Sequence, residues 1–249
     1  MMQQGMPPAG NPATGGVNSA IQMRPRTDEI LSGIWIALPI IAEILGFVVG
    51  GALLVIDVGL GFLGMFAGGI IATVVFAVLN YKLIDRMNEH SRREAMLRGA
   101  IIQHFRDKAN LDPGVGQRIS ASIATMESIQ YEAQMEEKEK SAALWAILPV
   151  FIGILILYPL YFLTKFTPEH DRRWQAFTQQ AQYAGNEMGM SIVLPSWRTV
   201  PERSYFLYLV LTLLTGFFAI YWYYVLIKDL NGHMQNQWQF EDQFAREMR

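Results

Sequence analysis

Three of the four histidines recur in one setting, and they are the first residues of this sequence that could do chemistry. His90, His170 and His233 each lie nine residues after a tyrosine at the end of an apolar stretch. The first two share the pattern Glu-His-x-Arg-Arg, and imidazole and carboxylate groups together can bind zinc or a related metal. Adjacent residues on a helix point apart, however, and the topology derived below places the two Glu-His pairs on opposite sides of a membrane. We therefore expect no metal site and no cofactor.

Glu43 is a second candidate, because it is a carboxylate in the middle of an apolar stretch. A charge there costs roughly 2.5–3.5 kcal/mol on insertion scales. One hypothesis is that Glu43 binds a proton or a cation inside a bundle of helices. The alternative is an acid that hydrogen-bonds to a hydroxyl group on another helix, for which the candidates are Thr73, Thr212, Thr215 and Tyr221.

The arginines of the repeated Glu-His-x-Arg-Arg pattern form a third candidate group. Clusters of basic side chains beside a membrane can bind lipid phosphates. Solvated arginines at the membrane surface are the alternative. The residues concerned are Arg92, Arg93, Arg172 and Arg173.

Composition narrows the classes of function that remain. The 249 residues are 51% hydrophobic and 17% charged, against about 25% charged in ordinary soluble domains. The net charge of −2 gives no field that favours nucleic acid. The lack of cysteine excludes disulfides, thiolate metal sites and a cysteine nucleophile. The sequence has no Ser/His/Asp arrangement, phosphate-binding loop or dinucleotide fingerprint, so we expect no catalytic residue and no enzyme.

Four apolar stretches are predicted to cross a membrane and to position these candidates. They lie near residues 31–54, 60–82, 142–164 and 204–227, and about 20 residues suffice to cross a bilayer core. A tight turn near Asp57 separates the first two. Backbone polar groups in lipid must be satisfied internally. The expected fold is therefore an all-α membrane protein with four transmembrane helices.

The distribution of Lys and Arg predicts the orientation in the cell membrane. Segment 82–140 has ten of them, the chain before it has two and the chain from Lys228 has three, which makes fifteen. Segment 165–203 has five. Because positive residues favour the cytoplasmic side, we expect both termini and segment 82–140 to be cytoplasmic and segment 165–203 to lie outside.

The polar segment 83–140 is predicted to be a cytoplasmic helical hairpin. Apolar residues recur at three- and four-residue steps on both sides of Pro113 and Gly114, which are turn residues. About 28 residues in each arm would give a stalk of roughly 40 Å. The alternative is a pair of helices that lie flat on the membrane.

The other polar segments are expected to be less regular. Residues 1–29 are rich in Gly, Pro, Gln and Asn, which is typical of a disordered tail. The extramembrane insertion 165–203 should contain a short amphipathic helix and a strap that carries Trp197. Residues 229–249 should form a polar C-terminal helix or tail.

An internal repeat relates the first and second pairs of spans. "YKLIDRMNEH" (residues 81–90) and "YVLIKDLNGH" (residues 224–233) are identical at five of ten positions, and Trp-x-x-Leu-Pro occurs at Trp35 and Trp145. These matches indicate two copies of a transmembrane hairpin, residues 30–82 and 141–228, in parallel orientation. The repeated residues suit a membrane–water boundary, and they are Tyr81, Asn88, His90, Tyr224, Asn231 and His233.

A third, weaker copy of the phrase complicates this interpretation. "YFLTKFTPEH" (residues 161–170) also places a histidine nine residues after a tyrosine. It falls on the opposite face of the membrane in the four-span topology. We therefore favour convergence at an interface, and a misplaced span is the alternative.

Residues 201–242, "PERSYFLYLVLTLLTGFFAIYWYYVLIKDLNGHMQNQWQFED", resemble an uncharacterised prokaryotic membrane family known as domain of unknown function 4234. The resemblance depends on Arg203-Ser204, Thr215-Gly216, the "IYWYY" cluster and the "DLNGH" and "QWQFED" motifs. It implies a small multi-pass membrane protein and no known reaction.

Three classes of function remain. The first is a non-catalytic scaffold in the lipid bilayer that binds a cytoplasmic protein through residues 84–139 and could form a homo-oligomer. The second is an ion- or solute-conducting protein that uses Glu43. The third is a membrane enzyme acting on a lipid or a polyprenyl carrier.

Overall fold

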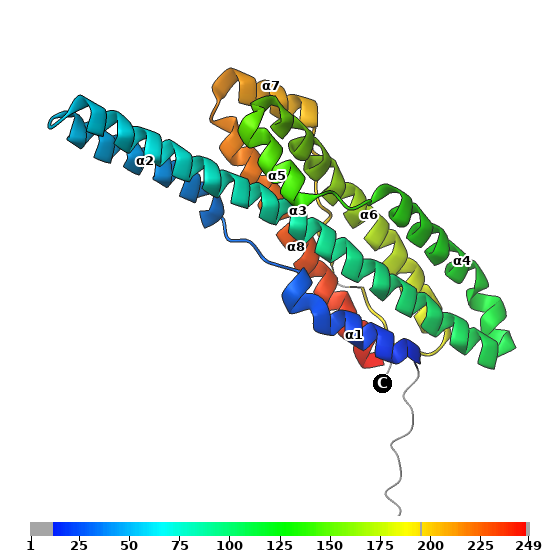
Figure 1. Ribbon diagram of the computed structural model, residues 1–249. Coiled ribbons are helices and arrows are strands. Elements are labelled where there is room, and N and C mark those ends of the chain that lie inside the picture. The colour runs from blue at the N-terminus through cyan, green and yellow to red at the C-terminus, as the bar shows by residue number, and fades with distance from the viewer. Residues whose placement is uncertain (1–11, 195, 248–249) are drawn as a thin grey trace, which may run out of the picture.

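The computed structural model describes residues 12–194 and 196–247, and these residues contain helices and no strand. Three hairpins pair α2 with α3, α5 with α6 and α7 with α8 (Figure 1). The helices are α1 (Pro12–Thr27), α2 (Ile34–Leu54), α3 (Val58–Leu111), α4 (Pro113–Glu136), α5 (Ala142–Phe151), the short 3₁₀ helix η1 (Gly153–Ile156), α6 (Leu157–Glu187), α7 (Tyr205–Thr215) and α8 (Phe218–Glu247).

The hairpin of α2 and the first part of α3 is an apolar arm that projects from the rest of the molecule (Figure 1). Both helices are long and apolar enough to cross a membrane. The 21 residues of α2 span about 31 Å. A Cβ atom added at Gly46 would lie 2.5 Å from the Cα atom of Gly68, so the two backbones touch through glycines. The turn near Asp57 is present as predicted.

The predicted third and fourth spans are wrong as single helices. After α5 the chain turns back through Ile152 and η1 into α6. After α7 it turns at Gly216, whose φ of +67° is a conformation that other residues rarely adopt. With 10 and 11 residues, α5 and α7 reach only about 15–17 Å, roughly half of a bilayer core. The structure therefore has two candidate membrane-spanning helices rather than four.

Because each hairpin turns back, α3, α6 and α8 leave the apolar part of the molecule on the same side (Figure 1). Segment 165–203 therefore lies beside segment 83–140, which corrects the prediction that they occupy opposite sides. The end of α6 touches α4, where Arg118 pairs with Glu187 at 2.8 Å. The amphipathic helix is present as part of α6, and an irregular strap follows it. Its Trp197 donates a hydrogen bond to Asp171 of α6 at 2.9 Å.

Segment 83–140 is a helical hairpin, as predicted, with its turn at Asp112 and Pro113. It is not a free stalk, because its apolar face is buried against α1, α6 and α8. The core on this side combines α3 and α4 with aromatic residues of α6 and α8, and includes Leu97, Ile101, Phe105, Ile119, Met126, Trp174, Phe177, Phe240 and Phe244. The hairpin also ends at Glu136 and is not continuous with α5.

The N-terminal end of the described chain is more ordered than the sequence indicated. The expectation of a disordered tail over residues 1–29 is wrong from Pro12 onward, because α1 buries Val17 and Ala20 in the same core. Residues 1–11 lie outside the described residues. The C-terminal segment is helical as expected up to Glu247, as the continuation of α8.

Candidate metal centre

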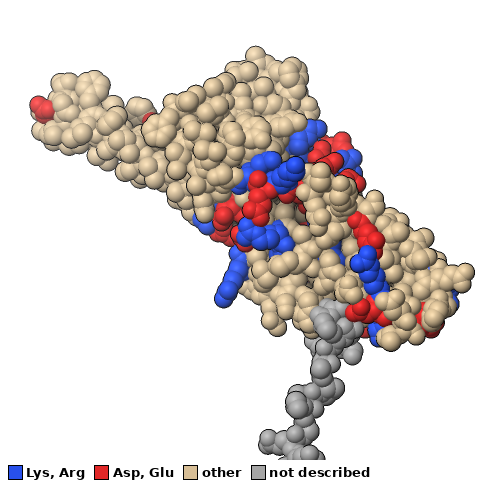
Figure 2. Space-filling model, turned by 45° about the vertical axis from the view of Figure 1, so that its right-hand side comes forward, with Lys and Arg blue, Asp and Glu red and all other residues tan. Residues whose placement is uncertain are grey.

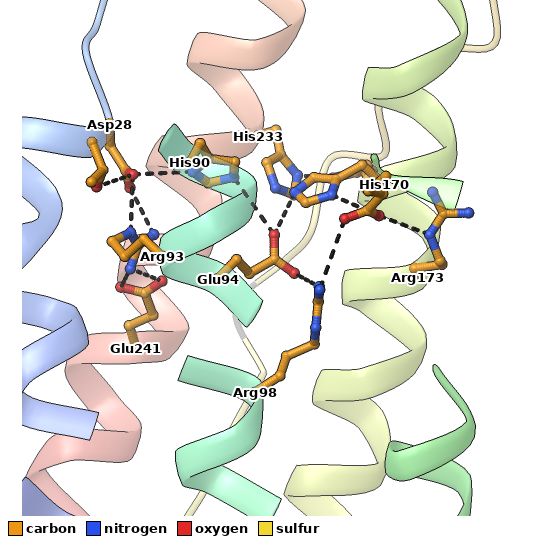
Figure 3. Close-up of polar contacts among 12 residues, drawn as sticks. Asp28, His90, Arg93, Glu94, Arg98, His170, Arg173, His233 and Glu241 are labelled. Atoms are coloured by element: carbon orange, nitrogen blue, oxygen red, sulfur yellow. Dashed lines mark hydrogen bonds and ion pairs between the residues drawn. The ribbon is translucent and has the colours of Figure 1, made fainter. Parts of the chain in front are cut away.

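Three histidines from three different hairpins meet where α3, α6 and α8 pack together. His90, His170 and His233 have ring centroids 4.8–5.3 Å apart, and all three side chains are fully buried (Figure 3). Each one is the last residue of a copy of the repeated ten-residue motif, and each lies on the second helix of its hairpin, called the returning helix below. The third copy of the phrase is thus structurally equivalent to the other two, and its assignment to the opposite face was wrong.

Each of these rings has a carboxylate oxygen within 3.1 Å of its Nδ1 atom, although the Nδ1 atom of His170 makes no hydrogen bond of acceptable geometry with the described residues. A carboxylate at this position favours the tautomer with a proton on Nδ1, and the Nε2 lone pair is then free to bind a metal. The three pairs are His90 with Asp28 at 3.1 Å, His170 with Glu137 at 3.0 Å and His233 with Asp171 at 2.7 Å.

The Nε2 atoms of His90 and His170 approach Glu94, which lies one helical turn after His90. Its Oε2 atom is 3.7 Å from the Nε2 atom of His90 and in direct contact with that of His170. The four groups could each offer one ligand atom, and these atoms all lie within 4.8 Å of one another. Buried polar atoms normally have a hydrogen-bond partner, yet the Nε2 atoms of the three histidines and Glu94 Oε2 have none with acceptable geometry. Three imidazoles and one carboxylate are a ligand set typical of zinc and neighbouring divalent metals.

Charge around the centre is nearly but not fully balanced by protein groups. Arg98 contacts Glu94, Arg173 pairs with Glu137 at 2.9 Å, and Figure 3 shows how these pairs surround the histidines. Isolated buried charges are costly, so such pairing is expected. Carboxylates still exceed guanidinium groups, five to four: Asp28, Glu94, Glu137, Asp171 and Glu241 against Arg24, Arg93, Arg98 and Arg173. The site therefore favours an additional positive charge.

The excess of carboxylates changes the acidity of the histidines. Burial lowers the pKa of His90 to about 4, although Asp28 opposes this shift, so His90 is neutral at pH 7. Burial would also lower the pKa of His170, but the carboxylates of Glu137 and Glu94 outweigh it and raise the pKa to about 9. Without a metal, the positive charge that the centre favours is therefore a proton on His170.

The two asparagines of the repeated phrase clamp the chain just before a hairpin, rather than facing water as predicted. Asn231 donates to the carbonyl of Leu31 at 2.8 Å and accepts from its N–H at 3.3 Å. Asn88 makes the same reciprocal pair with Lys140, at 2.7 and 3.1 Å. Asp28 and Glu137 lie three residues before these clamped positions. The clamps therefore position two of the carboxylates that hold the histidines.

The tyrosines of the repeated motif are all exposed, and their place at a membrane–water boundary stays a prediction. Tyr81, Tyr161 and Tyr224 are exposed to similar extents, 41–47%. Figure 2 shows that Lys, Arg, Asp and Glu gather around the middle of the molecule, next to its apolar part.

The candidate lipid-phosphate contacts divide into two kinds. Arg93 and Arg173 are buried and paired with carboxylates, which corrects their assignment to a lipid surface. Arg92 and Arg172 are exposed, and each pairs with a surface glutamate.

Glu43 is half-buried in α2 and lines a cavity of about 680 Å³ between α2, α3, α5 and α8. Thr73 lines the same cavity, but its hydroxyl group donates to Gly69 O at 2.8 Å. None of the described residues donates a hydrogen bond to Glu43, so its predicted hydroxyl partners are not confirmed.

Sequence reasoning missed several residues of the centre. Glu89 and Glu169, the glutamates adjacent to the histidines, are not part of it, whereas Glu94 is. The four-residue spacing of His90 and Glu94 on one helix face was a usable signal. No local pattern indicated Asp28, Glu137 and Asp171, because each lies beside the Nδ1 atom of a histidine on a different segment of the chain.

Comparisons with known proteins do not identify this centre. No family model, curated protein or solved structure matches the chain. The resemblance of residues 201–242 to the prokaryotic membrane family therefore stays a prediction, and the function is inferred from the site itself.

Proposed function

We propose that this protein is a membrane scaffold that binds one divalent transition metal, zinc by preference, through His90, Glu94, His170 and His233. One observation carries the proposal: three buried histidines and Glu94 bring one possible ligand atom each within 4.8 Å of one another, and each Nδ1 atom lies within 3.1 Å of another carboxylate. A carboxylate on the far nitrogen orients a metal-binding histidine and raises its basicity.

The metal would link the three hairpins of the protein. Each hairpin supplies one histidine, on α3, α6 or α8, so a single ion bridges all three returning helices. An ion that binds the folded state and not the unfolded chain stabilises the fold, by about 4.1 kcal/mol when its concentration is 1,000 times Kd. We infer that the metal fixes the angle between the apolar arm and the two shorter hairpins.

A membrane location is supported by the apolar surface of the arm. Large side chains on α2 and α3 are exposed on several sides, among them Val48 (62%), Phe62 (63%) and Phe66 (67%). An exposed apolar surface of this kind marks contact with a membrane or a partner. Residues 31–81 contain no Lys or Arg, whereas the bundle that holds the centre is rich in them. By the positive-inside rule, this distribution supports a cytoplasmic location for the bundle and for both ends of the described chain.

Metal content tests the proposal directly. Purified protein incubated with Zn²⁺ and passed through a desalting column should retain one zinc per chain, measured by elemental analysis. His90→Ala and His233→Ala should lose it. His104→Ala is the matched control, because His104 is the fourth histidine and lies outside the cluster. Retention of zinc at the background level, about 0.1 per wild-type chain or less, would refute the proposal.

The scaffold needs a partner surface, and α4 offers one. Tyr131 and Met135 are exposed at 66% and 52% on this helix, within the segment 84–139 that we expected to bind a cytoplasmic protein. Replacing both with serine should abolish co-purification of such a partner and leave the zinc content unchanged.

Conduction of an ion or solute is the second candidate. It is favoured by the position of Glu43 in the apolar cavity beside Thr73, Asn80 and Tyr223. Flux through liposomes containing wild-type protein, and its loss in Glu43→Gln, would support this function over a purely structural one.

A further inference from the structure

The helical layer next to the three histidines contains buried polar atoms that none of the described residues satisfies. Four residues after each histidine, on α3, α6 and α8, stand Glu94, Trp174 and Gln237. Residues four apart lie on the same face of a helix, about 6 Å apart along its axis. The three helices leave the hairpins in the same direction (Figure 1), so these side chains form one layer beside the histidines.

Glu94 completes the metal ligand set, but the other two members of the layer are unpaired. The Nε1 atom of Trp174 and both amide atoms of Gln237 have no hydrogen-bond partner, although both side chains are fully buried. Trp174 packs against Phe240, one turn beyond Gln237, with ring centroids 5.9 Å apart. Both unpaired groups thus lie at the same junction of α6 and α8.

Unsatisfied buried groups of this kind usually hold a water molecule or another small ligand. The side chain of Gln237 is one carbon longer than that of asparagine and has the same length as that of Glu94. From the equivalent position on α3, the carboxylate of Glu94 reaches the Nε2 atoms of His90 and His170. The equivalent position and the equal side-chain length give the Gln237 amide enough reach to contact a metal-bound molecule. Trp174 offers only a donor, whereas the Gln237 amide offers a donor nitrogen and an acceptor oxygen, so together they favour an oxygen ligand that both accepts and donates hydrogen bonds.

We propose that Trp174 and Gln237 hold an exchangeable, solvent-derived ligand, a water or hydroxide, bound to the metal as a fifth ligand beside His90, Glu94, His170 and His233. This inference rests on the proposed metal site. It adds that the site has an open coordination position, as catalytic metal sites do and closed structural sites do not. Gln237 and Trp174 are positioning residues for that ligand and not metal ligands themselves.

The test uses the full-length protein loaded with Cu²⁺, whose electron paramagnetic resonance lines broaden when a bound oxygen is ¹⁷O. Transfer of the wild type into H₂¹⁷O should broaden the lines. Gln237→Leu and Trp174→Phe should each reduce this broadening at least twofold, with one copper per chain retained. Gln239→Leu, an exposed position on the same helix, is the matched control and should behave as the wild type.

Three results would overturn the inference. The first is a wild type that binds one copper per chain and shows no ¹⁷O broadening, which would mean that protein atoms fill the coordination sphere, including direct coordination by Gln237. The second is unchanged broadening in both variants. The third is an equal reduction in Gln239→Leu. Failure of the wild type to bind any metal would instead refute the proposed function, so the two failures are distinguishable. If Gln237→Leu does not fold, Trp174→Phe, which keeps an aromatic ring at this position, still tests the inference.

Discussion

Metal affinity should depend steeply on pH, because the ion must displace a proton from His170. The pKa of this residue is raised to about 9 by Glu137 and Glu94, against the effect of burial. Below pH 9 the empty site holds this proton, so the apparent association constant should fall about tenfold for each unit that the pH decreases. Between pH 8 and pH 6 the loss is about 2.7 kcal/mol of binding free energy. Above pH 9 the affinity should become constant.

The assay is competition for Zn²⁺ against a fluorescent chelator of known pH dependence, at pH 6, 7 and 8 in detergent. Calorimetry in two buffers of different ionisation enthalpy should report about one proton released per zinc at pH 7. The Glu137→Gln variant lacks the charge that most raises the pKa of His170. Its zinc affinity should therefore stop changing with pH at a lower pH than in the wild type. An affinity that is equal at pH 6 and pH 8 would contradict the assignment of the proton to His170.

Three further predictions follow from the fold and the candidate metal centre. Cysteines introduced at the exposed positions Ser120 and Ser191 should react with an impermeant maleimide from the same side of the membrane, whereas labelling from opposite sides would exclude the half-length hairpins. Gly46→Ala should destabilise the arm by about 1–3 kcal/mol in thermal unfolding, since its Cβ would overlap Gly68. Gly51 faces open space, so the control variant Gly51→Ala should not destabilise the arm. Equal melting temperatures of the two variants would argue against glycine-mediated packing. The metal-free protein should lose stability as pH rises from about 6.5 to 9, because a histidine pKa raised on folding stabilises the folded state only while the histidine is protonated; zinc-loaded protein should not show this loss, and a metal-free melting temperature that stays constant over this range would contradict it.

Hydrophobic periodicity predicted the long helices well, because residues such as Ile101 and Ile119 recur on one face of α3 and α4 and are buried there. It failed for residues 142–164 and 204–227, since an apolar stretch of this length has the same composition whether it crosses a membrane or turns back halfway. Gly153 and Gly216 mark the turns, but glycine is also common inside transmembrane helices. The sequence alone could not separate these cases.

The error in topology also hid the candidate metal centre. With His170 assigned to the far side of the membrane, the three repeated histidines could not meet, and the metal hypothesis was rejected for that reason. Asp28 was inaccessible to sequence reasoning in a different way, because it lies in a Gly- and Pro-rich segment whose helix is stabilised by tertiary contacts with α3 rather than by local propensity.

The unequal lengths of the three hairpins have a consequence for the lipid around them. In a bilayer, the leaflet next to the cytoplasmic bundle would contain six helices, α2, α3 and α5 to α8, whereas the opposite leaflet would contain only α2 and α3. Each helix is about 10 Å wide, so the protein occupies roughly three times as much area in one leaflet as in the other. Such a wedge would expand the cytoplasmic leaflet relative to the opposite leaflet. The membrane would relieve this mismatch by curving so that its cytoplasmic face becomes convex.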